Sequence, residues 1–177
     1  QKQEGLFTVA YHPLGGTPSF ETLERLWNTI RDMEAVEGRI APDETLYIIN
    51  CTAQEARRVL EATADGAETL FETSVACIGV PVCQQGIGDS QALYHACVKA
   101  VRNAEISDGA LPQIHISGCP SSCGTHQIGA LGFRGGMKQV NGAAQPSFNL
   151  YVNGCDIKGE EAFGQDFGAM LAENIPA

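Results

Sequence analysis

Four of the seven cysteines stand in two closely spaced pairs, and this feature constrains the chain more than any other. Cys77 and Cys83 have five residues between them, whereas Cys119 and Cys123 have three. Each pair follows a segment that reads as a strand, in a loop that contains Gly or Pro. The sequence between the pairs predicts a helix and then a strand, a crossover that makes the two strands parallel neighbours. We therefore expect both loops to leave the same edge of one sheet and to meet at one centre.

Thiols at such a centre indicate metal ligation rather than disulfide bonds or ordinary buried side chains. An odd number of cysteines in a chain of 177 residues fits poorly with a fully paired disulfide framework. Structural zinc usually takes ligands with two to four residues between them, so a spacing of five is loose for it. An iron-sulfur cluster is larger and favours glycines and small residues, because backbone amides must approach its sulfides. Such residues surround both pairs, namely Gly79, Gly86, Gly88, Gly118, Ser121, Ser122 and Gly124. The pattern favours a cluster, with zinc and two disulfides as the alternatives.

Charge and hydropathy exclude other classes of function. The chain has 21 acidic and 11 basic residues, and its net charge of −10 repels phosphate backbones and anionic lipid headgroups. No apolar run approaches the roughly 20 residues of a membrane span, and the first residues lack the pattern of a signal peptide. We expect a cytoplasmic protein that binds neither nucleic acid nor membrane. Because the chain begins without Met and almost at once with a strand, we also expect it to be a piece of a longer polypeptide.

Residues 1–66 predict a small ferredoxin-like half-domain of the order β-α-β-α. Its elements are expected as a strand at 6–12, a helix from 17 to about 34, a short strand at 38–40, a strand at 45–51 and a helix to about 63. Four apolar residues recur at helical spacing on the first helix, namely Phe20, Leu23, Trp27 and Ile30. A capping box formed by Thr52 and Glu55 is expected to open the second helix.

Residues 67–177 predict a second domain, which carries both cysteine pairs. Its elements are expected as a strand at 69–76, a helix capped by Asp89 and ending near 107, a strand at 111–117, short strands at 128–133 and 148–152, and a last helix with apolar positions at 163, 167, 170 and 171. The other three cysteines, Cys51, Cys97 and Cys155, are expected to be core or surface side chains. The whole chain is therefore expected to be a mixed α/β protein of the α+β class.

The cysteine motif resembles the signature of the nitrite and sulfite reductase family. It reads C-x5-C and then SGCPSSCG, with Leu-Gly-Phe and Gly-Gly downstream. The segments GLFTVAYHPLGG and EGRIAPDETLYIIN also resemble that family's ferredoxin-like half-domain, so the resemblance covers most of the chain. It implies a siroheme and 4Fe-4S binding domain over 67–177. Since the family contains two such modules and the cluster cysteines belong to the second, the chain resembles the C-terminal, cluster-bearing module.

Carried onto this sequence, the resemblance makes Cys77, Cys83, Cys119 and Cys123 the cluster ligands. The sulfur of Cys123 would also bridge to the siroheme iron. Further siroheme contacts are expected from Ser121, Ser122, His126 and Arg134. No residue of this chain is assigned a catalytic role.

The resemblance implies an oxidoreductase that reduces sulfite to sulfide or nitrite to ammonia, each by six electrons. Its partners would be the remaining module of the reductase, a small inorganic anion as substrate, and an electron donor such as ferredoxin or a flavoprotein. The chain has no Arg or Lys between residues 59 and 98 or between 103 and 133, so the other module is expected to supply the cations that bind the anion. The isolated chain is then expected to be inactive. The alternatives are a single-module iron-sulfur electron-transfer protein without siroheme and a structural zinc module.

Overall fold

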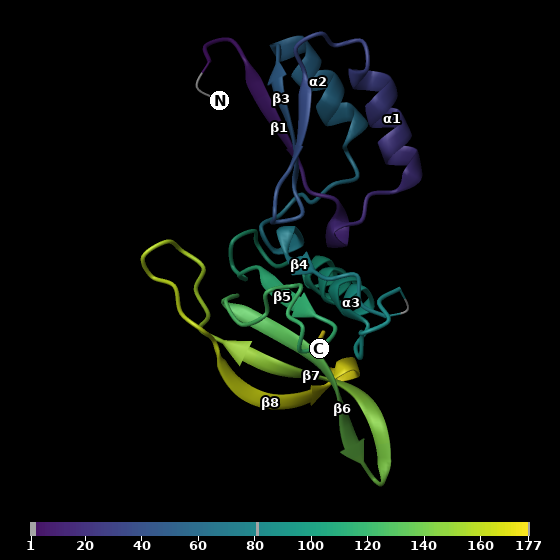
Figure 1. Cartoon of the computed structure of the whole chain (residues 1–177), viewed down its shortest axis with the longest axis vertical. Coiled ribbons are helices and arrows are strands. Elements are labelled where there is room, and N and C mark those ends of the chain that lie inside the picture. The colour runs from purple at the N-terminus through teal and green to yellow at the C-terminus, as the bar shows by residue number, and fades with distance from the viewer. Residues whose placement is uncertain (1–2, 81, 177) are drawn as a thin grey trace. The chain divides into compact units, whose positions relative to one another are not determined.

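A computed structural model describes residues 3–80 and 82–176 and divides the chain into two compact units, Gln1–Glu68 and Thr69–Ala177 (Figure 1). Each unit contains its own sheet, with three strands described in the first and five in the second. The first unit has one helix after its first strand and one after its third, and in the second unit the helix α3 (Ser90–Asn103) precedes four of the five described strands. The mixed α/β fold expected from the sequence is confirmed.

The first unit is an antiparallel sheet accompanied by two helices. Its strands are β1 (Phe7–Tyr11), β2 (Glu37–Ile40) and β3 (Leu46–Cys51), in the order β1-β3-β2. Its helices are α1 (Phe20–Ile30) and α2 (Ala53–Ala62), which pack against each other and, through α2, against β1 and β3. With the short strand β2 counted, the order is β-α-β-β-α.

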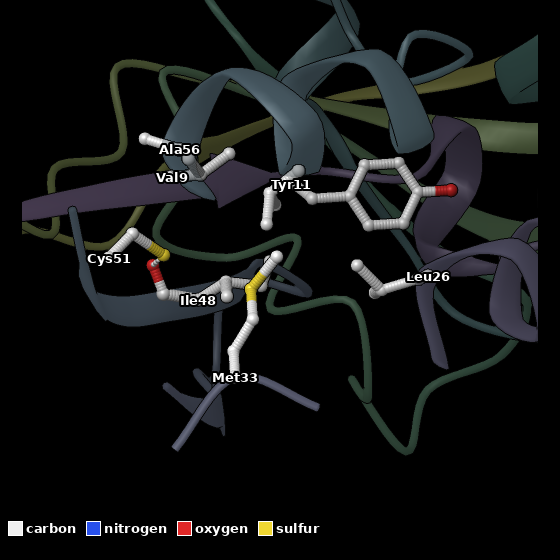
Figure 2. Close-up of a cluster of buried hydrophobic side chains, with 8 residues drawn as sticks. Val9, Tyr11, Leu26, Met33, Ile48, Cys51 and Ala56 are labelled. Carbon is white, nitrogen blue, oxygen red and sulfur yellow. Dashed lines mark hydrogen bonds between the residues drawn. The ribbon is translucent and has the colours of Figure 1, made fainter. Parts of the chain in front are cut away.

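Apolar side chains from all parts of this unit form its core (Figure 2). They are Val9, Tyr11, Leu26, Met33, Ile48, Cys51, Ala56 and Val59. Cys51 is thus a core side chain, as expected. The capping box of α2 is also confirmed, because the Glu55 carboxylate accepts the Thr52 N–H at 2.8 Å and Thr52 Oγ1 accepts the Glu55 N–H at 3.4 Å.

Helix α1 is shorter than expected, and the face that it buries is not the one that carries the four apolar residues. It begins after Ser19, whose hydroxyl accepts the Thr22 N–H at 3.0 Å, and it ends at Ile30. Phe20 and Trp27, expected on a core-facing stripe, are 77% and 61% exposed. The polar Thr22 is buried instead, because its hydroxyl donates to Asp65 at 2.5 Å and is thereby satisfied without water.

The second unit is a five-stranded sheet in the order β4-β5-β6-β7-β8. The strands are β4 (Val75–Ala76), β5 (Ile114–Ser117), β6 (Leu131–Val140), β7 (Ala143–Val152) and β8 (Gln165–Leu171). β4, β5 and β6 run parallel, and β7 and β8 continue the sheet antiparallel. Helix α3 (Ser90–Asn103) forms the crossover between β4 and β5, and Asp89 caps it by accepting the Ala92 N–H at 2.9 Å. The parallel neighbours expected from the helix crossover between the two cysteine pairs are confirmed.

Two strands differ from the expectation in length. The strand expected at 69–76 contracts to β4, because Phe71–Thr73 form a 3-10 helix instead and the Ser74 hydroxyl after it accepts the Ile114 N–H at 2.8 Å. The short strands expected at 128–133 and 148–152 are instead the ends of the long β6–β7 hairpin. Asn141 and Gly142 close the hairpin with φ values of 51° and 82°, the left-handed backbone of a tight two-residue turn.

The helix expected at the C-terminal end is wrong, since residues 165–171 form strand β8 against β7. The apolar spacing at 163, 167, 170 and 171 suits a helix, but Gly168 takes a φ of +93° that no helix contains. Phe163 and Phe167 are exposed rather than packed on a helical face. Within the described ranges, no helix is long and apolar enough to cross a membrane.

Candidate functional site

The four paired cysteines line one cavity of about 290 Å³ in the second unit. Cys77 and Cys83 lie on the loop between β4 and α3, and Cys119 and Cys123 lie on the loop between β5 and β6. We call these segments, residues 77–89 and 118–130, the first and second cysteine loops. They meet because β4 and β5 are parallel neighbours, so both loops leave the sheet at the same ends of their strands.

Polar contacts connect the first of these thiols, Cys77, to the second cysteine loop and to the first residue of α3. Cys77 Sγ accepts the backbone N–H of Gly118 at 3.1 Å and lies 3.3 Å from the hydroxyl oxygen of Ser90. The Ser90 hydroxyl also lies 2.6 Å from the Cys77 carbonyl, to which it donates. A backbone N–H that points at a cysteine sulfur is a typical contact of cluster ligands. Ser90 was missed by the sequence analysis, in which only its neighbour Asp89 had a role.

The four sulfurs differ in their access to solvent. Cys119 is buried, Cys77 and Cys83 are partly buried, and Cys123 is exposed. An exposed sulfur at the rim of the cavity has room to contact a second group outside it. Ser121 lines the same cavity, while the Ser122 hydroxyl donates to Oε1 of Gln127.

Glycines bring the backbone close to this cavity. Gly79, Gly86 and Gly118 line it. Gly79 has a φ of +54°, and a Cβ there would lie 2.3 Å from Ser90 Oγ. Four cysteine sulfurs and glycine backbone without side chains surround one cavity, and this combination fits the chemistry of an iron-sulfur cluster. Among the residues that the structure describes, no group of three or more His, Cys, Asp or Glu side chains is arranged so that it holds a metal ion.

His126 and Arg134, two of the expected siroheme contacts, meet at Tyr151. The rings of His126 and Tyr151 have centroids 4.9 Å apart, and the Arg134 guanidinium lies 5.7 Å from the Tyr151 ring centroid. His126 is only 2% exposed, and burial, with the nearby charge of Arg134, lowers its pKa from 6.5 to about 4. The structure thus places His126 in the interior of the unit, apart from the residues that line the cysteine cavity.

The remaining cysteines of the second unit have other surroundings. Cys97 is buried on α3 and lines a different, apolar cavity together with Phe71 and Ile114. Burial raises the pKa of its thiol from 9.0 to about 11, which disfavours the thiolate that a metal needs. Cys155 forms a backbone bridge with Ala162. Cys97 is thus a buried side chain, and Cys155 is not among the residues that line the cysteine cavity.

Comparison with known proteins finds relatives in sequence and fold, although no family model matches. The chain is 24% identical over 147 residues to "Sulfite reductase [NADPH] hemoprotein beta-component" of Bacillus licheniformis, an alignment that covers 77% of this chain and 23% of that protein. It is 27% identical over 161 residues to "Ferredoxin--nitrite reductase, chloroplastic" of Spinacia oleracea, with 87% of this chain and 27% of that protein covered.

The fold is similar to that of a solved structure described as "Structure of Mycobacterium tuberculosis NirA protein". The TM-score is 0.80 at 19% sequence identity, and the match covers 98% of this chain and 34% of that one. The chain spans about a quarter of the length of the curated relatives that it matches. The resemblance expected from the cysteine motif is confirmed.

Proposed function

We propose that this chain, a relative of the nitrite and sulfite reductases, is the 4Fe-4S and siroheme-binding module of a sulfite or nitrite reductase. The observation that carries the proposal is the meeting of Cys77, Cys83, Cys119 and Cys123 around one cavity. The relatives are oxidoreductases, and one is named a hemoprotein. Because the chain spans about a quarter of their length, we further propose that the remaining module of the reductase completes the enzyme.

In this proposal the four cysteines ligate the cluster as thiolates. The Gly118 N–H, which already donates to Cys77 Sγ, stabilises the negative charge of that sulfur. The buried position of Cys119 keeps water from its ligand bond. The bound groups would supply one-electron transfer to a small inorganic anion.

Cys123 is proposed as the sulfur shared with the siroheme iron, because it is the exposed one of the four ligands. Ser121 lines the same cavity and is proposed to contact siroheme beside Cys123. Ser122, His126 and Arg134 stay predictions as siroheme contacts. The alternative of an electron-transfer protein without siroheme is not favoured, because the named relatives are reductases.

The partners follow from charge and from the names of the relatives. Both cysteine loops lack Arg and Lys, so the cations that bind an anionic substrate are proposed to lie in the remaining module. A ferredoxin or a flavoprotein fed by NADPH is the proposed electron donor, since the relatives' names contain ferredoxin and NADPH. The cytoplasm is the proposed compartment.

The test is anaerobic reconstitution of the chain with iron, sulfide and siroheme, followed by metal and sulfide analysis and an absorption spectrum. Wild-type chain and the control Cys97→Ser are expected to bind about four iron and four sulfide, as a 4Fe-4S cluster requires. Cys77→Ser and Cys119→Ser are expected to lose the cluster, because an iron without its fourth thiolate is open to solvent and oxidation.

Three outcomes would contradict this proposal in different ways. Bound zinc without sulfide would favour the structural zinc module. A cluster spectrum that lacks siroheme bands, even when the remaining module is added, would favour the electron-transfer protein. Loss of the cluster in Cys97→Ser with retention in Cys119→Ser would show that the ligand set is wrong.

A further inference from the structure

Three glycines from three separate segments touch backbone to backbone beside the cysteine cavity. Gly88 belongs to the first cysteine loop, Gly118 to the second, and Gly135 to strand β6. A Cβ at Gly135 would lie 2.4 Å from the Gly118 carbonyl oxygen and 2.9 Å from Gly88 Cα. A Cβ at Gly88 would lie 2.9 Å from Gly135 Cα. All these clashes are with backbone atoms, so a side chain is accommodated only if a loop moves. We call these residues the glycine stack.

The middle residue of the glycine stack joins the two cysteine loops. The Gly118 carbonyl accepts the N–H of Ile87 at 2.9 Å and that of Gly88 at 2.7 Å. The Gly118 N–H donates to Cys77 Sγ at 3.1 Å. Gly118 therefore links the second loop both to the backbone of the first and to one of its sulfurs. Its position is limited on one side by Gly135.

We propose that Gly135, which lies outside both cysteine loops, is a positioning residue that sets the distance between them and the hydrogen bond from Gly118 to Cys77 Sγ. The proposal rests on the proposed function, since the loops matter through the cluster that they bind. Donors to a cluster sulfur stabilise the reduced form, so this hydrogen bond raises the reduction potential. An added methyl group at Gly135 pushes Gly118 away, weakens that bond and spreads the loops.

The chain offers a matched control in the next residue. Gly136 follows Gly135 on β6 and faces the opposite side of the sheet. The nearest atom to a Cβ at Gly136 is Ser147 Oγ at 3.9 Å, an ordinary contact distance. Gly135→Ala and Gly136→Ala thus make the same chemical change in the same strand, with and without a steric clash. Gly118→Ala is a second variant, since its Cβ would lie 2.7 Å from Gly88 O and 3.2 Å from Gly79 Cα.

The experiment has one arm without cofactor and one with it. In the chain without cofactor, hydrogen exchange is measured at the amides of Ile87 and Gly88. Gly135→Ala is expected to exchange about tenfold faster than wild type at both, the ratio that corresponds to losing one ordinary hydrogen bond. In the reconstituted chain, Gly135→Ala is expected to hold less iron and sulfide, and the cluster that remains is expected to have a more negative reduction potential. Gly118→Ala should shift both readouts in the same direction, and Gly136→Ala should match wild type.

Four other outcomes would contradict either the positioning role of Gly135 or the proposed function on which it rests. Equal exchange at Ile87 and Gly88 in Gly135→Ala and Gly136→Ala overturns the positioning role, whether or not a cluster binds. An unchanged potential in Gly135→Ala and Gly118→Ala overturns the link to Cys77. Loss of exchange protection throughout β6 and β7 in both of these variants also overturns the positioning role. The glycine stack would then be needed for the folding of the whole second unit rather than for the distance between the two loops. Failure of wild type to bind a cluster overturns the proposed function, and the exchange arm still decides the role of Gly135.

Discussion

Buried His126 is expected to make the second unit lose stability in mild acid. Burial and the charge of Arg134 hold the pKa of His126 at about 4 in the folded chain, against 6.5 for a histidine in water. In the described part of the chain, Nδ1 of this ring has no hydrogen-bond partner, so a proton added there would find no acceptor. The folded chain therefore keeps His126 neutral at a pH where the unfolded chain protonates it.

The sign and size of the effect follow from this difference in proton binding. Above pH 6.5 both states are neutral, and His126 does not make stability depend on pH. As the pH falls from 6.5 towards 4, the unfolded state alone takes up the proton, so the free energy of unfolding falls. With 1.36 kcal/mol for each pH unit between the two pKa values, the full loss is about 3 kcal/mol, and the loss at pH 5 is about 2 kcal/mol.

The assay is urea unfolding of the reduced, cofactor-free chain at pH 8 and pH 5, with hydrogen exchange of the β6 and β7 amides as the probe of the second unit. His126→Gln cannot take up the proton, so its stability should fall by about 2 kcal/mol less between the two pH values than that of wild type. His115 contributes in the same direction in both proteins, because burial lowers its pKa as well. His95→Gln, at an exposed position on α3, is the control. Equal losses in wild type and His126→Gln would refute the reasoning.

Three further outcomes are expected. Thr52→Ala should destabilise the first unit by about 1 kcal/mol through loss of the capping box, and unchanged exchange at the α2 amides would contradict this. Without cofactor the second unit should keep its fold while the two cysteine loops exchange faster than β5 and β6, so equal protection of loops and strands would count against it. The chain alone, loaded with cluster and siroheme, should not reduce sulfite or nitrite at a useful rate, because cations for the anion are missing from both loops. Turnover should return when the remaining module is added, and equal turnover without that module would show the reasoning to be wrong.

The sequence predicted well where local chemistry and chain connectivity decide the structure. The helix crossover between two strands was enough to predict that β4 and β5 are parallel and that both cysteine loops leave the sheet together. The capping box at Thr52 and the Asp89 cap depend on residues three positions apart, and both are present. These features need no knowledge of distant packing.

The predictions failed where distant contacts compete with local spacing. On α1 the pairing of Thr22 with Asp65 buries a polar face and leaves Phe20 exposed, which no periodicity in apolar residues reveals. In β8 the apolar residues are spaced as in a helix, but the left-handed backbone conformation of Gly168 is incompatible with a helix. Gly135 belongs to the Gly-Gly that follows the cysteine motif, but the sequence did not indicate its role, because that role depends on loops that are distant in the sequence.

The outward position of Trp27 has an optical consequence. It is the one tryptophan of the chain, it belongs to the first unit, and its side chain is largely in water. Its fluorescence should therefore already resemble that of a solvated indole in the folded chain and change little on unfolding. A blue shift of this emission would instead report a second molecule covering α1. Visible absorption, by contrast, would arise only from groups bound at the cysteines, so the two signals record independent events in the two halves of the chain.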